Sequence, residues 1–176
     1  MELKSFNEKE LNDIKKSWID SLSGGHEVYE AEYSQLFDII ITGRSWGELD
    51  DRFNAPIYYG IFDEDKVLAI VLIVQSKKGS STWIKLMDIY ICPEIDIHSD
   101  TEDNTKKRLD IFTTSLIGIF SLTENTKRVD TLKIYGRTDA LIAFLRGMHD
   151  VFSTFGMIQG VTVSIEGKWL VFCATK

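Results

Sequence analysis

Two side chains of this sequence could carry protons in a reaction. Asp88 stands in the middle of the apolar run Leu86–Cys92, where loss of hydration raises the pKa of a carboxyl group toward the range of a general acid or base. His149 stands at the end of a predicted helix, and an imidazole titrates near neutral pH. Each also has a structural interpretation, Asp88 as a hydrogen-bonded carboxylate and His149 as a helix cap or surface group.

The orientation of Asp88 is not decided by the sequence. Strict alternation along a strand places Asp88 on one face with Leu86 and Tyr90. The other face then carries Met87, Ile89 and Ile91. Both faces contain apolar residues, so either could face the interior.

Three consecutive cations, Lys106, Lys107 and Arg108, follow an acidic segment. Basic side chains in the first turn of a helix can bind phosphate groups, because the amino end of the helix itself attracts anions. The same three residues can instead form a solvated face that balances the acidic segment. The sequence contains no Gly-x-Ser-x-Gly elbow, Walker loop or zinc-site spacing, and we expect Cys92 and Cys173 to be buried free thiols.

The spacing of apolar residues predicts the elements that position these side chains. Asn7 followed by Glu10 has the pattern of a helix capping box. The run Val67–Val74 is apolar at every position, which is typical of a strand covered on both faces. The full expectation is a strand at 2–6, helices at 7–22 and 29–43, strands at 57–62, 66–75 and 83–92, a helix at 105–122, a strand at 129–135, a helix at 138–148, and a hairpin of 151–165 with 168–175 in which Gly156 or Gly160 marks a bulge.

Composition limits the class of protein. A chain of 176 residues with 44% hydrophobic and 27% charged residues is ordinary for one soluble domain and excludes disordered and low-complexity classes. The net charge of -7 argues against nucleic acid or an anionic membrane as a partner. The longest apolar run, Val67–Val74, is far shorter than the roughly 18 residues of a membrane span. We therefore expect a cytoplasmic protein, or one assembled into a particle there.

The predicted order of elements resembles that of the GNAT family of N-acetyltransferases. Leu86–Glu94 looks like the family's fourth strand, Thr131–Met148 looks like its fifth strand and fourth helix, and Val161–Ala174 looks like its closing hairpin. The resemblance implies an α/β fold, with a mixed, mostly antiparallel central sheet and helices on both faces, in a single domain over residues 1–176. The C-terminal part is most similar to GNAT-like internal virion proteins of short-tailed bacteriophages.

The resemblance also implies where acetyl-CoA would bind. The family holds the pyrophosphate on backbone N–H groups of a glycine-rich loop after the fourth strand. The matching stretch, Glu94–Thr105, contains no glycine and five carboxylates, so a polyanion meets repulsion there. Phe144 stands where many members have a proton-donating tyrosine, and phenylalanine cannot donate a proton. If acetyl-CoA binds, the implied contacts are Ile91, Lys106, Lys107, Arg108 and Arg137.

Three functions remain open. The first is a non-catalytic binding protein of GNAT fold, associated with a phage virion, that takes no cofactor or metal and has a virion or host protein as its partner. The second is an active N-acetyltransferase that transfers an acetyl group from acetyl-CoA to an amine, with Asp88 or His149 carrying the proton. The third is an acidic protein whose segment 94–103 binds a basic host factor. Exposed strand edges also favour a homo-oligomer.

Overall fold

The structure, a computed structural model, describes residues 1–22, 26–46, 53–79, 81–97, 101–125, 129–155 and 160–174. The described elements follow one another in this order: β1 (Glu2–Ser5), α1 (Glu8–Leu22), α2 (Glu27–Gly43), β2 (Pro56–Asp63), β3 (Lys66–Lys78), β4 (Ser81–Ile91), α3 (Pro93–Asp96), α4 (Glu102–Asn125), β5 (Val129–Tyr135), α5 (Asp139–Phe155), β6 (Val161–Glu166) and β7 (Trp169–Ala174).

The strands of the described residues form one seven-stranded sheet in the order β1-β2-β3-β4-β5-β7-β6. β4 and β5 run parallel, whereas the other neighbouring pairs are antiparallel. The parallel pair arises because α4 carries the chain from the end of β4 back to the start of β5. The predicted mixed, mostly antiparallel α/β architecture is confirmed.

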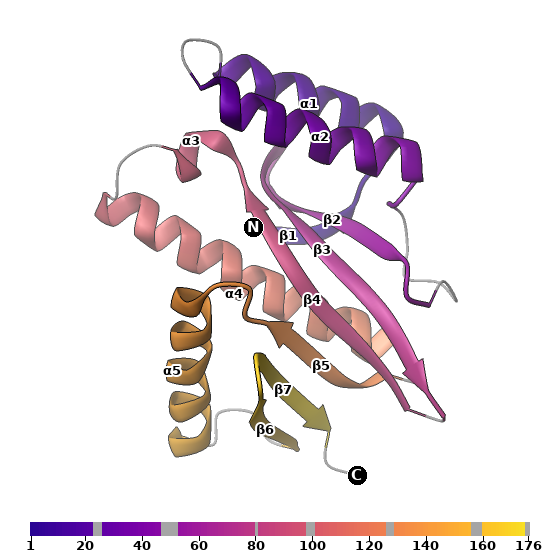
Figure 1. The fold of residues 1–176 in the computed structure, drawn as a ribbon, viewed down its shortest axis with the longest axis vertical. Helices are drawn as coiled ribbons and strands as arrows, with labels where there is room; N and C mark the ends of the chain where they lie inside the picture. Colours follow the sequence, from indigo (N-terminus) through magenta and orange to yellow (C-terminus); the bar gives the residue numbers. More distant parts are fainter. Residues whose placement is uncertain are drawn as a thin grey trace.

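Helices cover the sheet from both sides (Figure 1). α1 and α2 lie together on one side, and the hydroxyl of Tyr33 in α2 donates a 2.7 Å hydrogen bond to the carbonyl of Ile91 in β4. α4 crosses the opposite side and passes very close to β1. A Cβ atom at Gly118 of α4 would lie 2.3 Å from the Cβ atom of Leu3, so only glycine lets this helix approach the sheet so closely.

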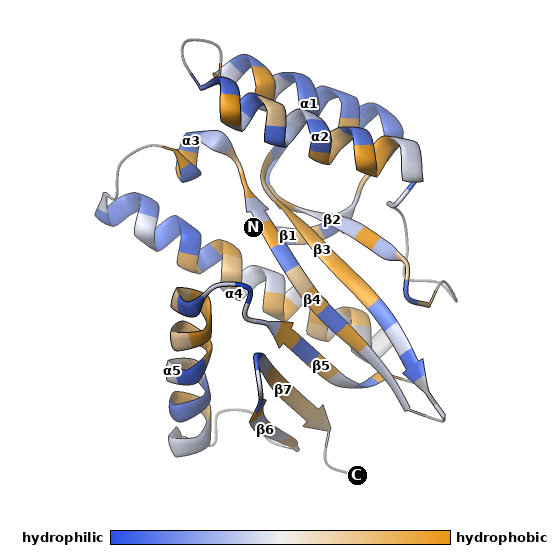
Figure 2. Cartoon of the chain, in the orientation of Figure 1, coloured by the Kyte–Doolittle hydropathy of each residue, from blue (hydrophilic) through white to orange (hydrophobic). Residues whose placement is uncertain are grey.

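β3 lies between the two helical layers. Each residue of Val67–Val71 is at most 7% exposed, and successive side chains of a strand point to opposite faces. Figure 2 shows the hydrophobic part of β3 beside the helices and a hydrophilic end at the tip of the β3–β4 hairpin. The prediction that this strand is covered on both faces is confirmed.

The helix start predicted at Asn7 is also confirmed. The backbone N–H of Glu10 donates to Asn7 Oδ1 at 2.9 Å, and the backbone N–H of Asn7 donates to Glu10 Oε2 at 2.7 Å. These two reciprocal bonds are the capping box.

The C-terminal third departs from the prediction. The expected strand at 151–165 is wrong in its first part, because α5 continues to Phe155. Phe152 packs its ring 5.5 Å from that of Phe172 in β7, and this packing outweighs the strand preference of the local sequence. Gly160, with φ 77°, lies just before β6 rather than in a bulge, and Gly156 lies outside the described residues.

Two smaller findings complete the fold. The one-turn helix α3 was not predicted, and α4 begins at Glu102 rather than Thr105. Cys92 is buried and Cys173 is half-buried, and both are free thiols. Among the described residues, no helix combines the length and the apolar character needed to cross a membrane.

Candidate functional site

The candidate site lies where β4 and β5 separate. The two strands pair from Thr82 and Val129 up to Leu86 and Ile134. β4 then continues to Ile91 with β3 as its partner. Among the described residues, its last residues have no strand partner on the β5 side. An opening between two parallel strands in the middle of a sheet exposes backbone donors and acceptors that a ligand can bind.

A β-bulge in β4 lies where the separation begins, and it decides the side on which Asp88 lies. Leu72 of β3 pairs with Asp88 while the next residue, Ile73, pairs with Leu86, so Met87 is the extra residue. Paired residues share a face, so Leu86, opposite Ile73, and Asp88, opposite Leu72, lie on opposite faces of β4. Leu86 faces α4, and Asp88 shares the α2 side with Tyr90 although it also borders the cavity on the α4 side. The prediction that Leu86 shares a face with Asp88 is therefore wrong.

Asp88 forms an ion pair across the opening. Its Oδ2 atom lies 2.8 Å from Nη1 of Arg137, which follows β5. The side chain of Asp88 is 26% exposed and that of Arg137 is 68% exposed, and Asp88 Oδ1 also accepts the backbone N–H of Ile89 at 3.0 Å. The structure thus brings together two of the residues singled out in the sequence, although they are far apart along the chain.

A small apolar cavity borders the opening on the α4 side. Its volume is about 180 Å³, and its lining includes Leu86 and Ile91 of β4, Phe112 of α4 and Ile134 of β5. Ile91 lines this cavity and the one on the opposite side of β4. The carbonyl of Ile91 already accepts the hydroxyl of Tyr33, so a ligand at this position competes with a hydrogen bond that is already made.

A larger cavity of about 470 Å³ lies between α2 and β4. Its lining includes four tyrosines, namely Tyr29, Tyr33, Tyr58 and Tyr90. Burial and the nearby carboxylate of Asp88 raise the pKa of Tyr90 to about 12 and also raise the pKa of Tyr58. Burial, with Asp96 as the next cause, raises the pKa of Tyr33. These phenols are therefore neutral hydroxyl groups at physiological pH.

The predicted cation cluster at the start of α4 does not act as a unit. Nη2 of Arg108 donates to the carbonyls of Ile95 and Asp96, at 3.0 and 3.2 Å, and thereby ties α4 to α3. Lys107 pairs with Asp103 at 2.6 Å. Lys106 is exposed and makes no ion pair within the described part of the chain.

The first turn of α4 is acidic. Thr101 caps the helix, its Oγ1 atom accepting the backbone N–H of Asn104 at 3.1 Å, and the next two residues are Glu102 and Asp103. A capped helix start with two carboxylates is already satisfied electrostatically. Residues 98–100, which belong to the predicted acidic segment, lie outside the described residues.

His149 and Phe144 lie on α5. Nδ1 of His149 lies 3.2 Å from Asp150, and Nε2 lies 3.3 Å from the hydroxyl of Ser153. Its described partners are thus its own helical neighbours, and it lines neither cavity beside β4. Phe144 packs edge-on against Phe112, with ring centroids 5.2 Å apart, so an aromatic ring without a hydroxyl stands beside the α4-side cavity.

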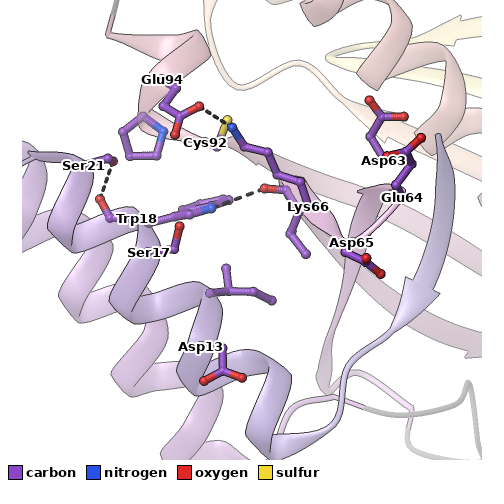
Figure 3. A pocket seen from close by; sticks show the side chains of 13 residues that line it. Asp13, Ser17, Trp18, Ser21, Asp63, Glu64, Asp65, Lys66, Cys92 and Glu94 are labelled. Atoms are coloured by element: carbon purple, nitrogen blue, oxygen red, sulfur yellow. Dashed lines mark hydrogen bonds and ion pairs between the residues drawn. The ribbon is translucent and has the colours of Figure 1, made fainter.

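A third cavity, of about 520 Å³, lies between α1, the β2–β3 turn and the end of β4. Figure 3 shows Lys66 and Glu94 pointing toward one another near Cys92, with Asp13 and Asp63–Asp65 around them. Burial raises the pKa of the Cys92 thiol, so it is protonated and a poor nucleophile. Within the described residues no cluster of three or more His, Cys, Asp or Glu side chains could hold a metal ion.

The tyrosines of the α2-side cavity were not singled out in the sequence. Aromatic residues in strands are mostly core residues, which hid Tyr58 and Tyr90. The signal that could have found Tyr90 is its position two residues after Asp88, on the same face of the strand. No local pattern links Tyr33 or Asp96 to them, because α2 and α3 join β4 only in the fold.

A solved structure is similar to this chain over nearly its whole length. The crystal structure of a possible acetyltransferase from Clostridium difficile 630 superposes with a TM-score of 0.50 and 14% sequence identity, covering 94% of this chain and 95% of that chain. No family model matches the sequence, and no curated protein matches it. At this identity the likeness concerns the fold, and with the sheet topology it gives the chain a GNAT-like fold.

Proposed function

We propose that this chain is a GNAT-like binding protein that does not use acyl-CoA. The observation that carries the proposal is the acidic first turn of α4, where Glu102 and Asp103 follow the Thr101 cap. The pyrophosphate of a GNAT cofactor approaches this helix end. Here it meets two carboxylates, and the guanidinium of Arg108 is engaged with the carbonyls of α3.

Two further contacts support the proposal. The ion pair of Asp88 with Arg137 spans the opening between β4 and β5, so a thioester arm threaded through it has to displace or pass this pair. Phe144, at the position of the family's tyrosine, supplies no proton to a departing thiolate. The cofactor therefore lacks both its anion site and its leaving-group acid.

Native mass spectrometry of gently purified protein tests the proposal. We expect the mass of the chain alone, 20.1 kDa, after expression in cells that contain acetyl-CoA. A stoichiometric CoA or acetyl-CoA adduct that disappears in the double variant Lys106→Glu, Lys107→Glu would overturn it. Both lysines are exposed, so these changes leave the core intact.

An active N-acetyltransferase is the second candidate. The observation that favours it is the opening itself, because β4 and β5 separate beside an apolar cavity. In this function Asp88 takes the proton of the acceptor amine, and Ile91, Arg108 and Arg137 line the path of the cofactor. His149 would have to act from α5 without lining either cavity. Acetylation of a general amine mixture, lost in Asp88→Asn, is the outcome that favours this candidate.

The finer form of the main proposal is a virion-associated phage protein in the host cytoplasm or in the particle. It rests on the resemblance of the C-terminal part to internal virion proteins. In this form the partner is a virion or host protein. A separate, third candidate is an acidic protein whose segment 94–103 binds a basic host factor, and a pull-down that weakens steeply with salt favours this candidate. Light scattering tests the homo-oligomer, which the exposed edge strand β6 favours.

A further inference from the structure

α5 lies at the margin of the fold and packs on β6 and β7 (Figure 1). Of its described side chains only Leu145 is buried, although the helix is rich in apolar residues. Phe144 and Val151 are 42% and 47% exposed. Large apolar side chains that gather on the outside of a helix indicate a surface that a partner covers.

The exposed apolar residues form one continuous stripe. Phe144, Gly147, Met148 and Val151 have the spacing i, i+3, i+4 and i+7, which places them on one face of the helix. Together with Phe152 they line an open apolar groove of about 380 Å³. Every described residue of this lining belongs to α5, so the α5 stripe has no cover from another described element.

The α5 stripe fits a second copy of itself. A two-fold axis between Gly147 and Met148 brings two α5 helices together in antiparallel orientation. Phe144 then packs on Val151 of the second copy, and each Met148 enters the space left at the other copy's Gly147. A Cβ atom at Gly147 meets nothing within 4 Å, so packing inside one chain does not require glycine there. A second helix that approaches closely does require it.

The charges beside the α5 stripe are self-complementary as well. Arg146 and Asp150 lie one turn apart next to Gly147, and both are exposed. In antiparallel helices Arg146 of each copy comes opposite Asp150 of the other, so the pair forms twice. The side chain of Asp150 is 79% exposed beside His149, which leaves access for a guanidinium. Parallel helices would place like charges together, so these charges select the antiparallel orientation.

We propose that α5 binds α5 of a second copy of this chain, in antiparallel orientation, through the α5 stripe. This interface differs from a pairing of the edge strands β6, because the stripe lies on the helix and not on the sheet edge. It involves neither cavity beside β4, so it holds whether or not the chain binds acyl-CoA. One helix–helix contact is a small interface, and we expect a dissociation constant of about 1–100 µM.

Sedimentation velocity of the purified chain, from about 1 to about 500 µM, tests the proposal. We expect the 20.1 kDa monomer to give way to a dimer over this range. Val151→Glu places a charge in the α5 stripe and should weaken the dimer at least about tenfold. Ile117→Glu is the matched control, at an exposed aliphatic side chain of α4, and should leave the dimer unchanged. A monomer at every concentration, or equal effects of the two variants, would overturn the proposal.

Variants beside the axis separate dimer formation from folding. Gly147→Ala has room within one chain, so it should weaken the dimer about tenfold while the monomer stays folded. Arg146→Glu should weaken the dimer about threefold, and the double variant Arg146→Glu, Asp150→Arg should restore it because the charges are exchanged. A stronger dimer in Gly147→Ala, or a double variant weaker than Arg146→Glu, would overturn the antiparallel arrangement.

Discussion

Asp88 Oδ2 lies 2.8 Å from Arg137 Nη1, and this ion pair joins β4 to the residues after β5 at the place where the two strands separate. Arg137 is largely exposed, and an ion pair with an exposed partner contributes about 1 kcal/mol or less to stability. Its role is therefore positional. It lies between the two cavities that border β4, and it sets the electrostatic surroundings of Tyr90.

The first prediction concerns the pKa of Tyr90, which burial and Asp88 raise to about 12 and which Arg137 lowers. Asp88→Asn removes a negative charge that disfavours tyrosinate, so the pKa of Tyr90 should fall toward its ordinary value of 10.0. Arg137→Ala removes the opposing positive charge and should raise it. Spectrophotometric titration of phenolate absorbance measures both shifts.

Tyr90→Phe identifies the titration of Tyr90 by difference. Asp88 also raises the pKa of Tyr58, so the difference titration is needed to separate the two phenols. An unchanged pKa of Tyr90 in Arg137→Ala would show that Arg137 does not lie beside Asp88 and Tyr90 in solution.

The second prediction concerns Arg108, which bonds the carbonyls of Ile95 and Asp96. Arg108→Ala leaves these carbonyls without a charged donor and should lower the free energy of unfolding by about 1–3 kcal/mol. Lys106→Ala should change it by no more than about 0.5 kcal/mol, since Lys106 is exposed. Urea denaturation compares the two. Equal and small effects would mean that Arg108 is as available to a phosphate as Lys106.

The third prediction compares two glycines in helices. Gly118→Ala places a methyl group against Leu3 and should destabilise the protein by about 1–3 kcal/mol. Gly147→Ala lies in open space on α5 and should stabilise it by about 0.5–1 kcal/mol through helix propensity. Both variants add the same methyl group, but the expected changes in the free energy of unfolding have opposite signs. If both stabilise, α4 does not cross β1 as closely as described.

The local patterns of the sequence predicted most elements because each pattern has a local physical cause. The Asn7–Glu10 capping box and the unbroken apolar run of β3 are read directly from residue order. The bulge at Met87 is not, because it depends on which β3 residues pair with β4. One extra residue there reverses the face of Asp88, which alternation alone had joined to Leu86.

The candidate site was predictable only in part for the same reason. Asp88 stood out by its residue type and Arg137 only through the resemblance to the GNAT family. Their contact spans β4 and the residues after β5 and has no local signature. Arg108 and Lys106 look alike in the sequence, and they differ only because α3 places its carbonyls beside Arg108. The α2-side cavity, with Tyr33 facing Ile91, exists only once the helical layer packs on the sheet.

Calorimetric titration of the purified protein with acetyl-CoA and with CoA, up to about 1 mM ligand, is the most direct test of the central claim that the acyl-CoA site is not functional. The acidic start of α4 and the ion pair across the β4–β5 opening predict no measurable heat of binding for either ligand. Micromolar binding of acetyl-CoA that is lost in the variant Lys106→Glu, Lys107→Glu would contradict the claim and would identify the chain as an acyl-CoA-binding protein.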